Sequence, residues 1–355
     1  MWIQFALLVM PAIVIASSLL IWIWRSQALD RYKKLIAVTL FLTFDLIVFG
    51  AFTRLTDSGL GCPDWPGCYS QANPFLAHAA ITAAQDLMPT GPVTLQKAWI
   101  EMIHRYLAMG VGVLIVAQMA IAWWRRATLQ HSPWLATFLF FFVCLQGAFG
   151  AWTVTLKLQP LIVTIHLLLG MGLLSLLAWS LAREIYPVRK LNTDSPKLIP
   201  IASFALIVLC IQIALGGWVS TNYAALACND YPLCNGVFAP EMDFEHGFTL
   251  WRQLGQKANG EYLPFSALVA IQWVHRSFAW IAIVGVLAAA YLARKTPALS
   301  SLGNKILIVI GLQLLSGVAT VFFSWPLLIA VLHNAGAAAL VLFLTMLNYR
   351  ARHAA

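Results

Sequence analysis

The chain of 355 residues is 61% hydrophobic and 10% charged, and its mean hydropathy is +0.80. Soluble domains carry about 25% charged residues, so this composition excludes a soluble globular domain and indicates an integral membrane protein. The net charge of +9 does not indicate a nucleic-acid partner, because the basic residues lie in short segments between apolar runs, as in membrane proteins.

Nine apolar runs approach the length of about 20 residues that a helix needs to cross a bilayer. The first, residues 3–24, has no basic segment before it and no small-residue cleavage site after it, so it is interpreted as a helix and not as a signal peptide. The other predicted spans are residues 35–53, 103–124, 134–153, 161–182, 198–219, 267–293, 305–323 and 327–348.

The chain repeats itself with an offset of about 166 residues. Cys62 and Cys68 recur as Cys228 and Cys234. The other matched pairs are Gly50 and Gly216, Gln146 and Gln313, Pro160 and Pro326, His166 and His333, and, with an offset of 171, His104 and His275. Each copy reads as a helix, a long loop with two cysteines, and three further helices. Four spans per copy give both copies one orientation, which predicts two four-helix bundles related by a pseudo-two-fold axis along the membrane normal.

The predicted fold is therefore an all-α integral membrane protein with nine spans. Its parts are an extra N-terminal transmembrane helix with a cytoplasmic loop (1–34), a first bundle (35–182), a cytoplasmic linker (183–197) and a second bundle (198–355). Of the 22 basic residues, 15 lie in one set of loops, and the positive-inside rule places this set in the cytoplasm. The N-terminus is then outside, the C-terminus is inside, and both cysteine loops are external, where disulfides can persist.

Four histidines occupy matching places in the two copies. His104 and His166, like His275 and His333, lie near the external ends of their predicted helices. Two imidazoles at one depth on facing helices can be axial ligands of a haem iron. The alternative is a set of interfacial histidines that bind backbone or lipid headgroups. It is disfavoured because ionisable residues inside spans are costly and usually functional. Zinc is also disfavoured, because no third or fourth ligand repeats with the histidines.

Arg105 and Arg276 directly follow their histidines. At the external boundary of the membrane, an arginine could bind a haem propionate, since its fork suits carboxylates. It could equally be an interfacial anchor whose charged head reaches water.

Glu101 breaks the symmetry of the repeat. It precedes His104 by three residues and so shares its helical face, whereas the second copy has Gln272 before His275. Only the first copy therefore has a carboxylate that could move a proton or stabilise a cation. The alternative is an ion pair with Arg105, four residues later. The difference suggests a reaction site in the first copy and a cofactor site in the second.

The two cysteine pairs allow two interpretations. Each could be a structural staple of its loop, or a thiol–disulfide couple that passes electrons. The staple is favoured for Cys228 and Cys234. Both interpretations stay open for Cys62 and Cys68, because that loop belongs to the copy with Glu101.

The stretch from Thr53 to Cys68 resembles the external-loop signature of the haem A synthase family. The segment from Glu101 to Arg105, and the dipeptides Gln159-Pro160 before His166 and Trp325-Pro326 before His333, are similar as well. The resemblance covers about residues 35–349. The run at residues 3–24 departs from the family's plan of eight helices.

The resemblance implies that the C8 methyl of haem O is oxidised to a formyl group by successive hydroxylations, giving haem A for terminal oxidases. It implies that His275 and His333 ligate a haem B cofactor, that His104 and His166 hold haem O, and that Glu101 acts beside the substrate. A bacterial-type inner membrane, a haem O synthase as supplier and an electron acceptor are expected with it, and no oligomeric state follows from the sequence.

Two other functions fit parts of the pattern. A di-haem electron-transfer cytochrome without substrate turnover would use the same histidines but would not need Glu101. A transporter of a hydrophobic substrate is disfavoured, because the polar residues lie near the external side and none continues the path through the cytoplasmic half.

Overall fold

The computed structural model describes residues 18–353 apart from residues 19, 26–29, 130 and 187–196. The described chain is helical, with isolated β-bridges and no longer strand. Eight of its helices are long and apolar enough to cross a membrane, and they match eight of the predicted spans. The ninth predicted span, residues 3–24, lies mostly outside the described residues, as does the linker 183–197.

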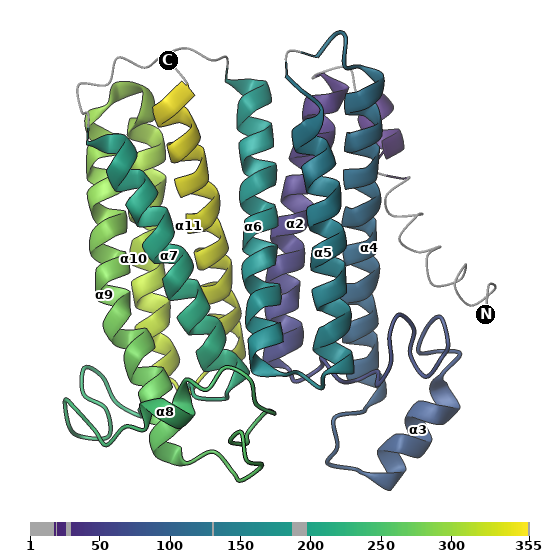
Figure 1. The fold of residues 1–355 in the computed structure, drawn as a ribbon, viewed down its shortest axis with the longest axis vertical. Coiled ribbons are helices and arrows are strands. Elements are labelled where there is room, and N and C mark those ends of the chain that lie inside the picture. The colour runs from purple at the N-terminus through teal and green to yellow at the C-terminus, as the bar shows by residue number, and fades with distance from the viewer. Residues whose placement is uncertain (1–17, 19, 26–29, 130, 187–196, 354–355) are drawn as a thin grey trace. The chain divides into compact units, whose positions relative to one another are not determined.

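Figure 1 shows the arrangement of the helices within each part of the chain. The eight long helices are α2 (Arg31–Leu55), α4 (Leu95–Trp124), α5 (Trp134–Thr155), α6 (Pro160–Ile185), α7 (Leu198–Thr221), α9 (Phe265–Lys295), α10 (Ser300–Phe322) with the 3-10 turn η1 (Pro297–Leu299) before it, and α11 (Leu327–His353). The short helices α3 (His78–Leu87) and α8 (Phe244–Gly247) lie in the two long loops. The apolar runs do not predict them, because neither is a long hydrophobic segment.

Helix α4 begins earlier than its apolar run. The predicted start at residue 103 is wrong, because the helix begins at Leu95. Thr94 caps it by accepting a hydrogen bond from the backbone N–H of Lys97 at 3.2 Å, which satisfies one of the free donors at a helix start. Polar residues in the first two turns lower the hydropathy without ending the helix. His104 therefore lies in the third turn of α4 and not at its start.

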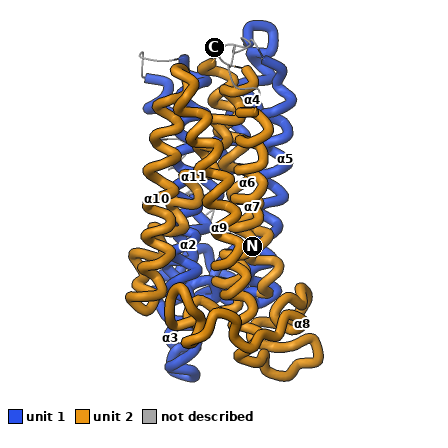
Figure 2. The backbone as a smooth tube through the Cα atoms, turned by 90° about the vertical axis from the view of Figure 1, so that its left-hand side faces the viewer, with its two compact units in different colours: residues 1–158 blue, residues 159–355 orange. Residues whose placement is uncertain are grey.

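The chain divides into two compact units, residues 1–158 and 159–355, shown in two colours in Figure 2. Unit 1 contains α2 to α5, and unit 2 contains α6 to α11. Helix α6 packs on α7 and α11 of unit 2, although the sequence repeat assigns it to the first copy. The division follows packing and not the repeat, so the predicted end of the first copy at residue 182 is not tested by it.

In unit 1, α4 packs on both α2 and α5. A buried hydrogen bond of 2.7 Å joins α4 to α2, donated by Gln118 Nε2 to Thr39 Oγ1. Large apolar side chains such as Phe41 and Phe141 are exposed instead. Polar groups inside and apolar groups outside are the arrangement that a hydrocarbon surrounding requires, because lipid offers no hydrogen-bond partner.

In unit 2, α7, α9, α10 and α11 form a ring in which each helix packs on the next and α11 closes on α7. Small residues permit close approach of the helices. A Cβ placed on Gly285 of α9 would lie 3.2 Å from Val208 of α7, and one on Gly303 of α10 would lie 2.9 Å from the carbonyl oxygen of Ala290 on α9. The ring places α9 and α11 at opposite corners.

A buried polar cluster joins α11 to α7 in unit 2. Asn348 Nδ2 donates to the carbonyl oxygen of Ala202 at 2.9 Å. Its Oδ1 accepts from Ser203 Oγ at 3.0 Å and from Arg352 Nη1 at 2.8 Å. Both halves of the amide are therefore satisfied between the helices.

Local backbone conformations recur with the offset of the repeat. The peptide bonds Trp65–Pro66 and Tyr231–Pro232 are both cis. Residues with positive φ also recur at an offset of 166 or 167, namely Asp57 and Tyr223, Tyr69 and Asn235, Ser70 and Gly236, Lys157 and Ser324, and Leu158 and Trp325. The two cysteine loops, and the two short turns before Pro160 and Pro326, thus share local backbone geometry.

We expect Asn348→Ala to lower the free energy of unfolding of the protein in detergent by about 0.6–2 kcal/mol, the usual range for hydrogen bonds between membrane helices. Asn334→Ala is the matched control, because Asn334 on the same helix donates only to Ala330 O within α11, at 2.9 Å. Equal losses in the two variants would show that the contact with α7 contributes nothing.

Candidate functional site

Glu101 is 4% exposed, and both of its carboxylate oxygens are bound. Oε1 accepts a hydrogen bond from Arg105 Nη2 in a buried ion pair. Oε2 accepts from the backbone N–H of Cys62 at 2.8 Å. The ion pair that the sequence offered as an alternative is therefore present, together with a direct contact to the disulfide loop that the sequence did not predict.

Arg105 holds the first cysteine loop. Its Nη1 donates to the carbonyl oxygens of Asp64 at 2.9 Å, Pro66 at 3.2 Å and Gly67 at 2.5 Å. The guanidinium thus binds both the loop and Glu101. Neither of the roles that the sequence left open for Arg105, a propionate contact or an interfacial anchor, accounts for these bonds.

The first cysteine loop lies directly on α4. A Cβ on Gly61 would come within 2.5 Å of the backbone carbon of Lys97, so only glycine permits this approach. Within the loop, the carboxylate of Asp64 accepts from the backbone N–H groups of Tyr69 and Ser70 at 2.7 and 2.5 Å. The Cys62–Cys68 disulfide is formed, and both cysteines are 0% exposed.

The second cysteine loop is held by the same kinds of hydrogen bond. Arg276 Nη2 donates to the carbonyl oxygens of Asp230 at 2.6 Å and Leu233 at 2.9 Å. The carboxylate of Asp230 accepts from the backbone N–H groups of Asn235 and Gly236 at 2.6 and 2.9 Å. The Cys228–Cys234 disulfide is also formed. The arginine after each histidine therefore fixes the disulfide loop of its own copy.

Gln272 contacts the second loop where Glu101 contacts the first, with the opposite polarity. Its Nε2 donates to the carbonyl oxygen of Ala225 at 3.1 Å, whereas Glu101 accepts from Cys62 N. The Oε1 atom of Gln272 is buried without a hydrogen-bond partner among the described residues. At this position the loop of unit 2 is therefore attached to α9 by an amide and not by a carboxylate.

His104 lies against α2. A Cβ on Gly50 would be 3.0 Å from His104 Nε2, and the ring of Phe49 is stacked on the imidazole with centroids 6.3 Å apart. A side chain at residue 50 would displace the imidazole, which explains the glycine here.

His275 on α9 and His333 on α11 stand on helices at opposite corners of the ring in unit 2. They are close enough for charges on the two imidazoles to interact. Each ring rests on a glycine of a neighbouring helix, since a Cβ on Gly216 or Gly317 would be 3.0 or 3.1 Å from the facing Cε1 atom.

The surroundings of these two imidazoles fit a haem held by two axial ligands. A ligating histidine needs a partner on its other ring nitrogen to orient it. Nδ1 of His275 contacts Gln212 Nε2 at 3.1 Å, and Nδ1 of His333 contacts Ser316 Oγ at 2.9 Å. Gln212 Nε2 also donates to the carbonyl oxygen of His275 at 3.1 Å, and its Oε1 is buried without a partner among the described residues. Gln313 Nε2 lies 3.3 Å from Nε2 of His333, so this side chain would have to turn away for that nitrogen to hold a haem iron.

His166 lies on α6, in unit 2, whereas His104 lies in unit 1. Near His166, Thr164 faces α7: its hydroxyl oxygen is 3.4 Å from that of Thr221. The predicted pairing of His104 with His166 joins residues of different units, and it stays a prediction.

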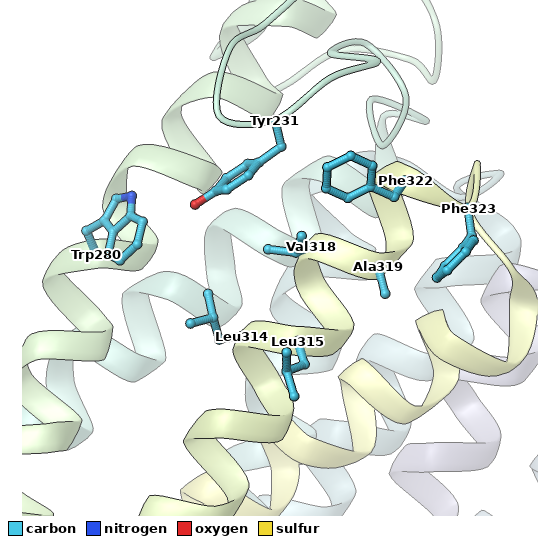
Figure 3. Close-up of a pocket in the computed structure, with 8 residues that line it drawn as sticks. All are labelled: Tyr231, Trp280, Leu314, Leu315, Val318, Ala319, Phe322 and Phe323. Carbon is cyan, nitrogen blue, oxygen red and sulfur yellow. The ribbon is translucent and has the colours of Figure 1, made fainter.

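An apolar groove of about 490 Å³ lies on unit 2 beside α9 and α10 (Figure 3). It is lined by Tyr231, Trp280, Leu314, Leu315, Val318, Ala319, Phe322 and Phe323. The Tyr231 hydroxyl points toward the indole of Trp280, and the other side chains are hydrocarbon. Gln313 and Ser316, which contact His333, do not line it. The groove offers no acid–base or metal-binding group and suits lipid contact.

Sequence reasoning missed the residues that orient the two imidazoles of unit 2. The sequence repeat matches Gln313 with Gln146, but it does not predict that the amide of Gln313 contacts His333. Gln212 gave no signal, because Leu46 occupies the matching place in the first copy. Asp64 and Asp230 recur at the repeat offset, and that recurrence could have identified them as loop caps.

We expect Gly216→Val to lower the amount of haem retained by the purified protein, because the added side chain pushes against the His275 imidazole. Overpacking of this kind costs about 1–3 kcal/mol. The measurement is the haem-to-protein ratio from the Soret absorbance. Gly311→Val on α10 is the control, since a Cβ there meets nothing within 4 Å. Equal haem content in both variants would contradict the placement of His275 as a ligand.

Comparisons with known proteins identify the family of this chain. A sequence model of the COX15-CtaA family, described as cytochrome oxidase assembly protein, matches residues 33–345. A protein named Heme A synthase from Shewanella oneidensis is 39% identical over 320 residues, which cover 89% of this chain and 95% of the relative. Proteins of the same name from Rhizorhabdus wittichii and Caulobacter vibrioides are 30% and 29% identical, over 89% and 91% of this chain and 92% and 97% of the relatives. Because the match covers most of its length, this chain belongs to the COX15-CtaA family of cytochrome oxidase assembly proteins.

Proposed function

We propose that the protein is a haem A synthase, a multi-pass enzyme of the bacterial inner membrane that oxidises the C8 methyl of haem O to the formyl group of haem A. The family match and the names of the relatives support this activity. The observation that carries the site assignment is the buried Glu101 carboxylate, one turn from His104 and bound to the first disulfide loop, where the second copy has an amide.

His275 and His333 would hold the cofactor, haem B, in unit 2, and His104 and His166 would hold the substrate, haem O. Bound haem supplies one-electron oxidation and reduction. The protein's part at the cofactor is orientation, through Gln212 on Nδ1 of His275 and Ser316 on Nδ1 of His333.

The reaction converts a methyl group and one water into a formyl group, and it releases four electrons and four protons. Two hydroxylations give a geminal diol, which loses water to form the aldehyde. Removal of electrons from the methyl leaves positive charge at the edge of the macrocycle. A fixed carboxylate beside that carbon stabilises the charge and can accept the proton of an attacking water. Glu101 has the charge and the helical face for this role.

The four electrons require an acceptor, which we propose to be a separate partner. The supplier of the substrate would be a haem O synthase. A di-haem cytochrome without turnover is not favoured, because the relatives are named as synthases and because such a protein gives Glu101 no role.

The cysteine loops are proposed to lie outside the cytoplasm, with the N-terminus outside, the C-terminus inside, the ninth span at residues 3–24 and the two copies related by a pseudo-two-fold axis. The recurring loop geometry supports the duplication. Burial favours the staple for both disulfides, because Cys62, Cys68, Cys228 and Cys234 are each at most 2% exposed and exchange requires access to the sulfur.

For Glu101→Gln, we expect bound haem to be retained and haem A formation to fall by about 10²–10⁴-fold, the usual contribution of a positioned acid or base. Mass spectrometry of extracted pigments should show haem O or a hydroxylated intermediate. The control is Glu245→Gln, which neutralises an exposed acid of the second long loop. A normal yield of haem A from Glu101→Gln would rule out a catalytic carboxylate.

The division of labour between the histidines makes a second prediction. His275→Ala should lose the resident haem B, and His104→Ala should keep it but lose bound haem O. Pigment extraction from the two purified variants and the wild type measures both. Loss of the same pigment from both variants would contradict the assignment of separate sites.

A further inference from the structure

Arg252 is a buried cation in the second long loop, and it has no acidic partner. Arg252 is 4% exposed. No Asp or Glu oxygen of the described residues lies within ion-pair distance of it, whereas Arg105 has Glu101. Burial lowers the pKa of the Arg252 guanidinium, and no acid opposes this effect. A charge removed from water without a counter-charge is strongly unfavourable, so this environment favours the binding of an anion.

The neighbours of Arg252 satisfy only part of its hydrogen-bonding capacity. Nη2 donates to Asn222 Oδ1, and Nη1 donates to the carbonyl oxygen of Gln256 at 3.3 Å. The guanidinium lies over the ring of Trp218, 5.7 Å from its centroid. Nε is buried without a partner among the described residues. The carboxyl end of α7, capped by Asn222, offsets part of the charge but leaves this donor unused.

Contacts place Arg252 at the end of unit 2 where α6 begins and α7 ends. Asn222 follows Gly216, the glycine under His275, by six residues, which is about 9 Å along the helix axis. On α6, His166 follows Pro160 by the same six residues, and Gln159 Nε2 donates to Leu250 O, two residues before Arg252, at 3.5 Å. Arg252 thus stands beyond both imidazoles on the side of the long loops.

We propose that Arg252 binds a propionate carboxylate of one of the two haems. A haem carries its two carboxylates on one edge, and that edge would lie on the side of Arg252 when it is turned toward the long loops. A carboxylate would supply the missing negative charge and accept from the free Nε–H, which is the bond that the arginine fork makes best. This inference rests on the proposed function for its ligand. The haem is either the substrate on His166 or the cofactor on His275 and His333.

The test uses the purified full-length protein and two probes, the free acid and the dimethyl ester of each haem. Soret titration with haem O measures the substrate site, and reconstitution of haem-depleted protein with haem B measures the cofactor site. In the wild type, esterification should weaken binding of one haem by about 10- to 100-fold, as expected for loss of a charged hydrogen bond. The free acid should bind to Arg252→Gln about 10- to 100-fold more weakly than to the wild type. Esterification of the haem should have no further effect on binding to this variant.

Two further variants complete the design. Arg252→Lys keeps the charge but not the fork and should recover part of the affinity. Lys257→Gln removes a cation of the same loop that pairs with Glu261 at 3.0 Å, and it should change nothing. An effect confined to haem O identifies the substrate as the ligand, and one confined to haem B identifies the cofactor. Equal affinities in the wild type and Arg252→Gln for both haems, or an ester effect that persists in the variant, would overturn the proposal. Neither titration requires turnover, so failure to form haem A would count against the proposed function alone.

Discussion

The geometry of the first site depends on the hydrogen bonds that the guanidinium of Arg105 makes to the cysteine loop and to Glu101. Arg105 follows His104 and lies one turn after Glu101, so a single turn of α4 carries a histidine, a carboxylate and the side chain that holds the disulfide loop. The loop has no regular structure to satisfy its buried carbonyl groups, and such groups need donors. Arg105 supplies them to three residues of the loop. The same contact fixes the distance between Glu101 and the backbone of Cys62.

The second copy separates the structural part of this arrangement from the chemical part. Arg276 holds the loop of unit 2 as Arg105 holds that of unit 1, and Gln272 makes one neutral hydrogen bond to it. An amide is therefore sufficient to attach a disulfide loop to its helix. A buried carboxylate at the same place is more costly to desolvate than an amide. Loop attachment alone does not explain Glu101, whereas the proposed charge stabilisation during the reaction would explain it.

The sequence predicted the eight long helices and both cysteine pairs, because these depend on hydropathy and on spacing within one element. It did not predict the partners of the histidines or of the arginines, because these depend on packing between elements. Gln212 meets His275 across α7 and α9, and Arg105 binds carbonyl groups of a loop about 40 residues away. The early start of α4 was missed because capping by Thr94 and polar first-turn residues do not raise hydropathy.

The distribution of charge now differs between the units in a way that matches their proposed tasks. In unit 1, the buried arginine beside the histidine is paired with the carboxylate of Glu101. In unit 2, Nε of Arg252 and Nη1 of Arg276 are buried without a hydrogen-bond partner among the described residues. Unpaired donors favour anions, and the carboxylates of a macrocycle are anions that a haem-binding bundle must accommodate. On the proposed function, negative charge in one copy would serve the reaction, and positive charge in the other would serve binding.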